Sequence, residues 1–381
     1  MSEQTTNTVD AGKQSGRMIE QDIAKGVAIF LVILFHTLTM EKSFFYILGG
    51  LFGFIMPFFF FIAGYNHKPY RYTYKQIIAL RSKQILVPLI VYTFVINAIG
   101  GVYFMITRGY TLRMVAENYL VMLLTRRFAS MVGLQMANGL FSCIMVSWFI
   151  IMLFTASLIF YAVVDYALAK ASRLISVTIG LLMISMVCAH FDLCLPFHIC
   201  EAPCVAAIML LGAFFGQKKL LSDQYSRRSI VINSIVSYFL FLLLAAMFKG
   251  AGLIMGGNLW NDTLKEWSVL LTAAFAIVGT YPFVHACRCL RNTGILARSL
   301  IWCGSHSMQL LLIHGIVQLF LCEILGMEPF RMSAMSEVTD LRTIYLLALE
   351  MAVSVLIILG IEYIQKRIKK QIKTRSDDQC H

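Results

Sequence analysis

The sequence predicts an all-α integral membrane protein with about ten transmembrane helices and both termini in the cytoplasm. Of its 381 residues, 59% are hydrophobic and only 14% are charged, whereas about a quarter of the residues of a soluble protein are charged. The apolar residues come in blocks of about 18–25, the length that a helix needs to cross roughly 30 Å of hydrocarbon. Transmembrane strands would be alternating segments of about 10 residues. These observations exclude a soluble enzyme.

Ten apolar blocks are interpreted as spans, of which the sixth is short for a crossing. They lie near residues 24–42, 44–65, 85–106, 140–164, 174–190, 204–216, 229–248, 268–284, 299–325 and 342–362. An even number of spans returns the chain to its starting side. Of the 32 Lys and Arg residues, 23 then lie on the side of the N-terminus and 9 on the other. Since cytoplasmic loops carry the excess of positive charge, both termini are expected in the cytoplasm.

The chain is expected to form one membrane domain, residues 19–365, between two short tails. Residues 1–18 are rich in Ser, Thr, Gln and Gly and are expected to be a disordered cytoplasmic tail. Residues 366–381 are expected to be a basic cytoplasmic tail. The first apolar block has no small-residue cleavage site, so it is interpreted as a retained span and not as a signal peptide. We expect a multi-pass protein of a cell membrane, most simply the bacterial plasma membrane.

The net charge of +12 suits anionic lipid headgroups and also a phosphate-rich cytosolic ligand. The basic residues are spread over separate loops, so nucleic acid is not an expected partner. The ten cysteines show no spacing typical of a metal site, and no metal is expected.

The first span carries two polar groups that hydrocarbon disfavours, Lys25 and His36. Eleven helical steps of ~100° turn through about 1,100°, only ~20° from whole turns, and rise some 16 Å. The two side chains therefore lie on one face of one helix. Lys25 is near the cytoplasmic headgroups, and His36 lies at or beyond the middle of the membrane, where an ionisable group must face protein or water. Such a face suits a polar track with a cation at its cytoplasmic mouth.

Each residue also has a simpler explanation. A lysine at a helix start commonly anchors the helix by the positive-inside rule, and a single intramembrane histidine can just hydrogen-bond a neighbouring helix. Both occur on one face here, which favours a functional role but does not name a reaction.

Five motifs, in order along nearly the whole chain, resemble those of membrane-bound acyltransferase family 3, and most closely its fucose 4-O-acetylase-like group. They are Asp22-x-x-Lys25-Gly26 running on to His36, MPFFFFIAGY at 56–65, RSKQILVP at 81–88, Trp148-Phe149, and Gly304, Ser307 and His314. Two positions depart from that group's pattern: Ile55 stands where it usually has a histidine, and Ala63 where it has a serine.

The resemblance implies a fold of about ten helices that transfers an acyl group, usually acetyl, from a cytosolic acyl-CoA. The acceptor it implies is a hydroxyl of a cell-surface glycan or lipid-linked sugar. Residue by residue, it makes His36 the catalytic histidine, and His314, the second catalytic candidate, would help line the shared cavity. It places Lys25, Arg81 and Lys83 at the end that binds acetyl-CoA.

The chemistry of these side chains fits that reaction. The phosphates of CoA need lysines and arginines at the cytoplasmic mouth. A sugar hydroxyl is a weak nucleophile, so an imidazole would take its proton as general base or would carry the acyl group itself. Arg81 and Lys83 are equally well explained as charges of a cytoplasmic loop.

Two other classes of function stay open on the sequence alone. A proton-coupled transporter or flippase of a glycan-related substrate would also bury histidines and the intramembrane Glu350. A scaffolding membrane protein would have little reason to bury Lys25, His36, His314 and Glu350 together.

Overall fold

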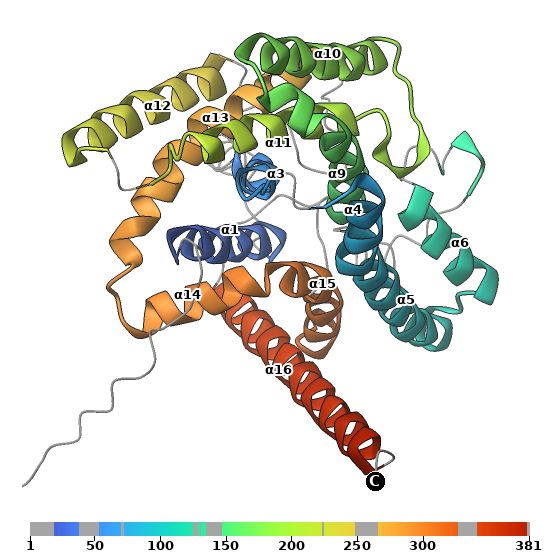
Figure 1. Cartoon of the computed structure of the whole chain (residues 1–381). Helices are drawn as coiled ribbons and strands as arrows, with labels where there is room; N and C mark the ends of the chain where they lie inside the picture. The colour runs from blue at the N-terminus through green and yellow to red at the C-terminus, as the bar shows by residue number, and fades with distance from the viewer. Residues whose placement is uncertain are drawn as a thin grey trace, which may run out of the picture.

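The computed structural model of the chain (Figure 1) describes residues 19–37, 53–69, 72–124, 129, 131–134, 147–222, 225–247, 266–326 and 341–378. All regular structure within these residues is helical. The first elements are α1 (Ile19–Thr37), α3 (Ile55–Tyr65), α4 (Tyr74–Arg81), the π-helical turn η1 (Ser82–Leu86), α5 (Val87–Arg108) and α6 (Leu112–Leu124). They are followed by α9 (Ser147–Leu168), α10 (Ala171–His190), η2 (Pro196–His198), α11 (Ala202–Gln217), α12 (Arg227–Met247), α13 (Glu266–Cys287), η3 (Arg288–Leu290), α14 (Ile295–Ser305), α15 (Ser307–Ile324) and α16 (Leu341–Asp378).

Eight helical segments are long and apolar enough to cross a membrane. They are residues Tyr74–Arg108, Ser147–Leu168, Ala171–His190, Pro196–Gln217, Arg227–Ala246, Glu266–Leu290, Ser307–Ile324 and Ile344–Gln371. The predicted all-helical, multi-pass membrane fold is therefore confirmed. The number of ten spans and the cytoplasmic termini stay predictions. The predicted tail at 1–18 lies outside the described residues, and the basic residues after 365 continue α16 as helix.

Helix α1 differs from the expected first span because it begins at Ile19, five residues early, and it is not among the eight apolar segments. Its first turns carry Glu20, Gln21 and Asp22, all buried. Sequence hydropathy excludes such residues from a span, but contacts with neighbouring helices cover them here. The expected end of this span at 38–42 lies outside the described residues.

The expected span at 299–325 is two helices, α14 and α15, which meet at His306. The ring of His306 stacks on Trp302 with centroids 4.2 Å apart. Its Nδ1 lies 2.8 Å from the Trp302 carbonyl oxygen, and its Nε2 lies 2.8 Å from Glu362 Oε1 of α16. These contacts hold the break in place and join it to the last helix.

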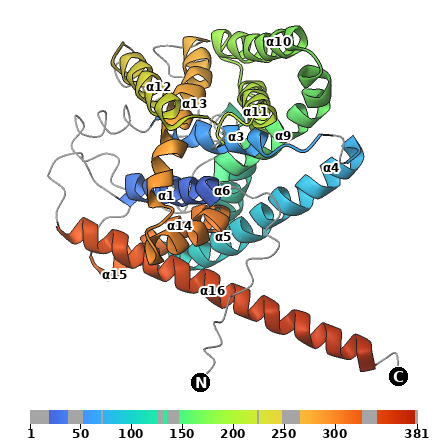
Figure 2. The ribbon, with the colours of Figure 1, turned by 60° about the vertical axis from the view of Figure 1, so that its left-hand side comes forward.

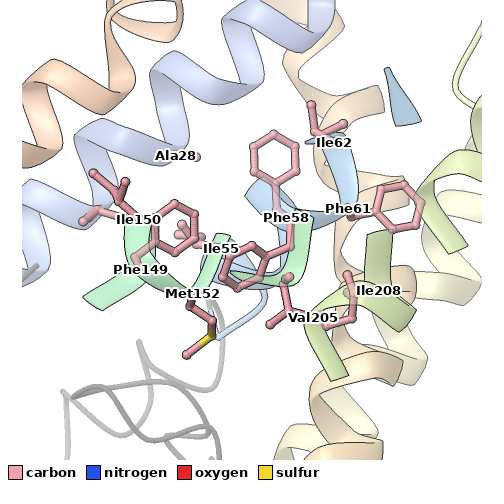
Figure 3. Close-up of a cluster of buried hydrophobic side chains, with 14 of the residues drawn as sticks. Ala28, Ile55, Phe58, Phe61, Ile62, Phe149, Ile150, Met152, Val205 and Ile208 are labelled. Atoms are coloured by element: carbon pink, nitrogen blue, oxygen red, sulfur yellow. The ribbon is translucent and has the colours of Figure 1, made fainter. Parts of the chain in front are cut away.

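Helix α3 lies at the centre of the bundle and is packed by α1, α11 and α13. Figure 3 shows its Ile55, Phe58, Phe61 and Ile62 among side chains of α1, α9 and α11. Phe60 of α3 stacks on Phe149 of α9 with centroids 4.6 Å apart. A helix that is apolar all round is buried in the interior. This explains why α3, which has only 11 residues, lies in the middle of the fold.

Glycines set the closest helix contacts. A Cβ on Gly64 would lie 1.9 Å from the carbonyl oxygen of Met209 in α11, and one on Gly212 would lie 2.0 Å from that of Phe61 in α3. Between α1 and α14, a Cβ on Gly26 would meet the Leu300 carbonyl at 2.1 Å, and one on Gly304 would meet the Asp22 carbonyl at 2.0 Å. Small residues let membrane helices approach to backbone contact. Figures 1 and 2 both show α1 against α14.

We predict that Gly304→Ala lowers the free energy of unfolding by about 1–3 kcal/mol, because the new methyl group overpacks the α1–α14 contact. The thermal unfolding of the purified protein in detergent measures this. Gly180→Ala in α10 is the matched control, since a Cβ there meets nothing within 4 Å. Equal melting temperatures for the two variants would contradict the importance of this contact.

Candidate active site

Two imidazoles from distant parts of the sequence meet in the helix bundle. His36, in the last turn of α1, and His314, in the middle of α15, have ring centroids 5.2 Å apart and planes inclined by 58°. His314 is fully buried, and His36 is partly buried. The structure thus brings together the two residues that the sequence singled out as catalytic. Their roles in catalysis stay predictions.

Each imidazole is oriented by the helix that carries it. His36 Nδ1 lies 2.7 Å from the Val32 carbonyl oxygen, and His314 Nδ1 lies 3.1 Å from that of Leu310, in both cases one turn earlier. A carbonyl oxygen only accepts, so each Nδ1 carries a proton and donates it. In the neutral ring, Nε2 then has the lone pair. Nε2 is therefore the atom of each ring that can take up a proton or an acyl group.

Polar side chains from three helices surround the end of α1. Gln318 lies one turn after His314 and donates its side-chain amide to the His36 carbonyl oxygen at 2.9 Å. Thr37 Oγ1 lies 2.7 Å from Glu350 Oε2 of α16 and 2.8 Å from the Ile33 carbonyl oxygen. Gln318 and Glu350 are both buried. The site is therefore a buried polar region where α1, α15 and α16 meet.

Lys25 lies at the opposite end of α1 beside acidic groups. Its Nζ is 3.3 Å from Asp22 Oδ1, and its side chain is 22% exposed. One turn before, Glu20 accepts from Arg291 at 2.9 Å. The continuous helix from Ile19 to Thr37 confirms that Lys25 and His36 belong to one helix, eleven residues apart.

Arg81 and Lys83 lie in another part of the bundle, where α4 and η1 pack on α9. The Arg81 guanidinium donates to the Tyr161 hydroxyl and lies 5.1 Å from the centroid of the Tyr161 ring. Lys83 is exposed within the π-helical turn, a feature that is frequent at functional sites. Their contacts do not join either residue to Lys25, and a role in donor binding stays a prediction.

Sequence reasoning missed Gln318 and Thr37 and left Glu350 without a role. The signal for Gln318 was its place four residues after His314, because residues four apart share a helix face. Thr37 could not be recognised, since its importance comes from Glu350, 313 residues away.

His67, which follows α3, is a further buried imidazole that the sequence did not single out. Its Nε2 lies 3.5 Å from Asp165 Oδ1 of α9, and its side chain is only 5% exposed. Its ring contacts Phe160 and Tyr161. Burial lowers the pKa of His67 from its ordinary value of 6.5, although the Asp165 carboxylate opposes this change.

The fold and the site together define a multi-pass membrane protein with two imidazoles in contact inside the bundle, one of which, His36, shares helix α1 with Lys25. Such an arrangement suits catalysis inside the membrane. The chain belongs to acyltransferase family 3, whose acyltransferase domain model matches residues 19–363. Neither a curated protein nor a solved structure matches the chain. The protein is therefore a membrane acyltransferase.

We predict that Arg291→Met lowers the free energy of unfolding by about 1–3 kcal/mol, because it leaves the Glu20 carboxylate, 8% exposed, without its partner. The matched control is Arg108→Met, which breaks an ion pair of the same 2.9 Å length whose glutamate, Glu323, is 31% exposed. It should cost about 0–1 kcal/mol. Chemical denaturation of both variants measures the difference, and equal losses would contradict the role assigned to burial.

We predict that His67→Gln makes stability less sensitive to acid. The pKa of His67 is lower in the folded state, so below about pH 6.5 the unfolded chain binds a proton that the folded chain does not. Wild-type stability should then fall as the pH falls from 6.5 through the folded pKa, and the variant should lose part of this dependence.

Melting temperatures between about pH 7.5 and 5.5 test the change. The control is His190→Gln, whose side chain is 62% exposed, and it should keep the wild-type slope. If the melting temperature of His67→Gln depended on pH as steeply as that of the wild type, His67 would not be a source of the acid sensitivity.

Proposed function

We propose that this membrane acyltransferase is an O-acetyltransferase. It moves an acetyl group from cytosolic acetyl-CoA to a hydroxyl of a cell-surface glycan or lipid-linked sugar, in a bacterial plasma membrane. The observation that carries the proposal is the His36–His314 pair, whose ring centroids lie 5.2 Å apart in the bundle, within a chain that matches the family from residue 19 to residue 363. The resemblance to the fucose 4-O-acetylase-like group supports a sugar acceptor.

The spacing along α1 suits an acyl-CoA donor. Lys25 and His36 are eleven residues apart, or some 16 Å at 1.5 Å per residue, a distance that the long, thin pantetheine arm can bridge. Lys25 would bind a phosphate of CoA in exchange for its contact with Asp22. Arg81 and Lys83 would add positive charge at the cytoplasmic side, where an anionic substrate arrives.

The reaction needs a base for the acceptor hydroxyl, and His36 Nε2 would be that base. In the direct route, Nε2 takes the hydroxyl proton while the hydroxyl oxygen attacks the thioester carbonyl carbon. The C–O bond forms, the C–S bond breaks, and the thiolate of CoA leaves and takes the proton. In the alternative route, Nε2 attacks the thioester carbonyl carbon, the C–S bond breaks and the thiolate of CoA leaves an acyl-histidine. The hydroxyl oxygen then attacks the acyl carbon, the N–C bond breaks, and the hydroxyl proton goes to the thiolate.

His314 would act on the same reacting groups because its ring is the nearest imidazole. Both rings have Nδ1 bound to a carbonyl oxygen, so both would present an acceptor nitrogen. In either route, His314 Nε2 would hold the acceptor hydroxyl by accepting a hydrogen bond, beside His36.

We predict that His36→Ala lowers the rate of acetyl transfer by about 10²–10⁴-fold, the usual contribution of a general acid or base. The measurement is the transfer of labelled acetyl from acetyl-CoA to membrane glycans, in vesicles that contain equal amounts of folded protein. His190→Ala, a change at an exposed histidine, is the control.

Undiminished acetylation by His36→Ala would reject the catalytic assignment. Substrate flux without acetyl-CoA consumption by the wild-type protein would favour the transporter. Mass spectrometry of surface polysaccharides from a deletion strain identifies the natural acceptor, through the loss of one acetyl increment.

A further inference from the structure

Four buried polar atoms around the end of α1 have no hydrogen-bond partner among the described residues. They are His314 Nε2, Gln318 Oε1, Glu350 Oε1 and Ser354 Oγ, and their side chains are at most 2% exposed. Orphaned buried polar atoms are rare and cost free energy, so four at one site indicate that a ligand or water normally completes it.

Three of these four side chains form one cluster because they contact His36 or Thr37, which are consecutive residues of α1. Gln318 binds the His36 carbonyl oxygen, Glu350 contacts Thr37, and the His314 ring faces the His36 ring. Ser354 lies one turn after Glu350 on α16, on the same helix face. The cluster lies beyond His36, at the end of α1 opposite Lys25.

The two short contacts of the Thr37 hydroxyl favour a neutral Glu350. Its hydroxyl has one hydrogen, yet its Oγ1 lies 2.8 Å from the Ile33 carbonyl oxygen and 2.7 Å from Glu350 Oε2. Both bonds form fully when Thr37 donates to Ile33 and Glu350 carries a proton on Oε2, which it donates to Thr37. Glu350 is then a neutral carboxylic acid, and its Oε1 is a carbonyl-type acceptor.

The unpaired atoms of the cluster therefore need hydrogen-bond donors, and they do not need a counter-charge. An imidazole nitrogen, an amide oxygen and a carboxylic acid oxygen all accept, and only Ser354 Oγ can also donate. A ligand with several O–H groups supplies the missing donors. A cation would need an ionised Glu350, and an anion would need donors in place of acceptors.

We propose that His314, Gln318, Glu350 and Ser354 form the acceptor subsite, which binds a neutral, polyhydroxylated ligand such as a sugar through its hydroxyl groups. This inference rests on the proposed function and adds to it the residues that bind and select the acceptor. Gln318 and Glu350 act as specificity-determining residues, and one hydroxyl of the ligand is delivered to the two imidazoles.

Acetyl transfer from labelled acetyl-CoA to membrane-partitioning probes tests the proposal. The probes are octyl glucoside and octyl galactoside below their micellar concentrations, their monodeoxy analogues, and octanol, which has a single hydroxyl. The wild-type protein should prefer at least one octyl hexoside to octanol by about 10²-fold or more in kcat/KM, because a site built to bind hydroxyls rejects a ligand that lacks them.

Variants at Glu350 separate binding from packing. Glu350→Met, close in volume but without acceptor or donor, should raise the KM for the octyl hexoside about 10–100-fold, leave the KM for acetyl-CoA within about 3-fold, and reduce the discrimination against a monodeoxy analogue. Glu350→Gln keeps a carbonyl-type oxygen and a donor for Thr37, so it should stay within about 3-fold of wild type. Glu323→Met on α15 is the control and should leave both KM values unchanged.

The outcomes distinguish failure of the proposed acceptor subsite from failure of the proposed acetyltransferase function. Equal transfer to octanol and octyl hexosides, or unchanged discrimination in Glu350→Met, would overturn the subsite and leave the acyltransferase standing. A loss in Glu350→Gln as large as in Glu350→Met would overturn the neutral state of Glu350 and with it the neutral ligand. No acetyl-CoA consumption by the wild-type protein, with any probe or with its own membranes, would overturn the proposed function itself.

Discussion

The close contact of α1 with α14 and α15 is the constraint on which the rest of the structure depends. Helix α1 carries charged and titratable groups that hydrocarbon would reject, so it needs other helices over its polar face. Gly26 and Gly304 allow backbone contact between α1 and α14, Arg291 neutralises Glu20, and α15 begins where α14 ends. The same packing places His314 beside His36. The helix packing that buries the polar groups of α1 therefore also assembles the candidate site.

The two ends of α1 differ in the chemistry that they offer. At the first turns the groups are ionic, with Lys25, Asp22 and the Glu20–Arg291 pair close to the end of the helix. At the last turn they are two imidazoles, an amide, the Thr37 hydroxyl and the Glu350 carboxyl, and the last two lie within hydrogen-bond distance of each other. In the proposed reaction, Lys25 would meet the polyanionic donor at the ionic end, and the uncharged groups at the other end would meet the sugar. One helix would then align both substrates along a single line.

Much of this arrangement follows from the sequence, because it depends on local periodicity. Helix geometry alone puts Lys25 and His36 on one face, and apolar block lengths give the membrane fold. The break at His306 and the early start at Ile19 were not predicted. Both depend on partners distant in the sequence, Glu362 and Arg291. The contacts of Thr37 and Gln318 are of the same kind, since hydropathy cannot show which helices meet.

A structure of the protein bound to an acetyl-CoA analogue with a thioether in place of the thioester tests the central claim most directly. The account predicts that the phosphates lie at Lys25, that the arm runs along α1, and that the atom replacing the acyl carbon lies within contact distance of His36 Nε2, between the two imidazoles. An analogue bound elsewhere, with His36 turned to lipid or closed off from the arm, would contradict it.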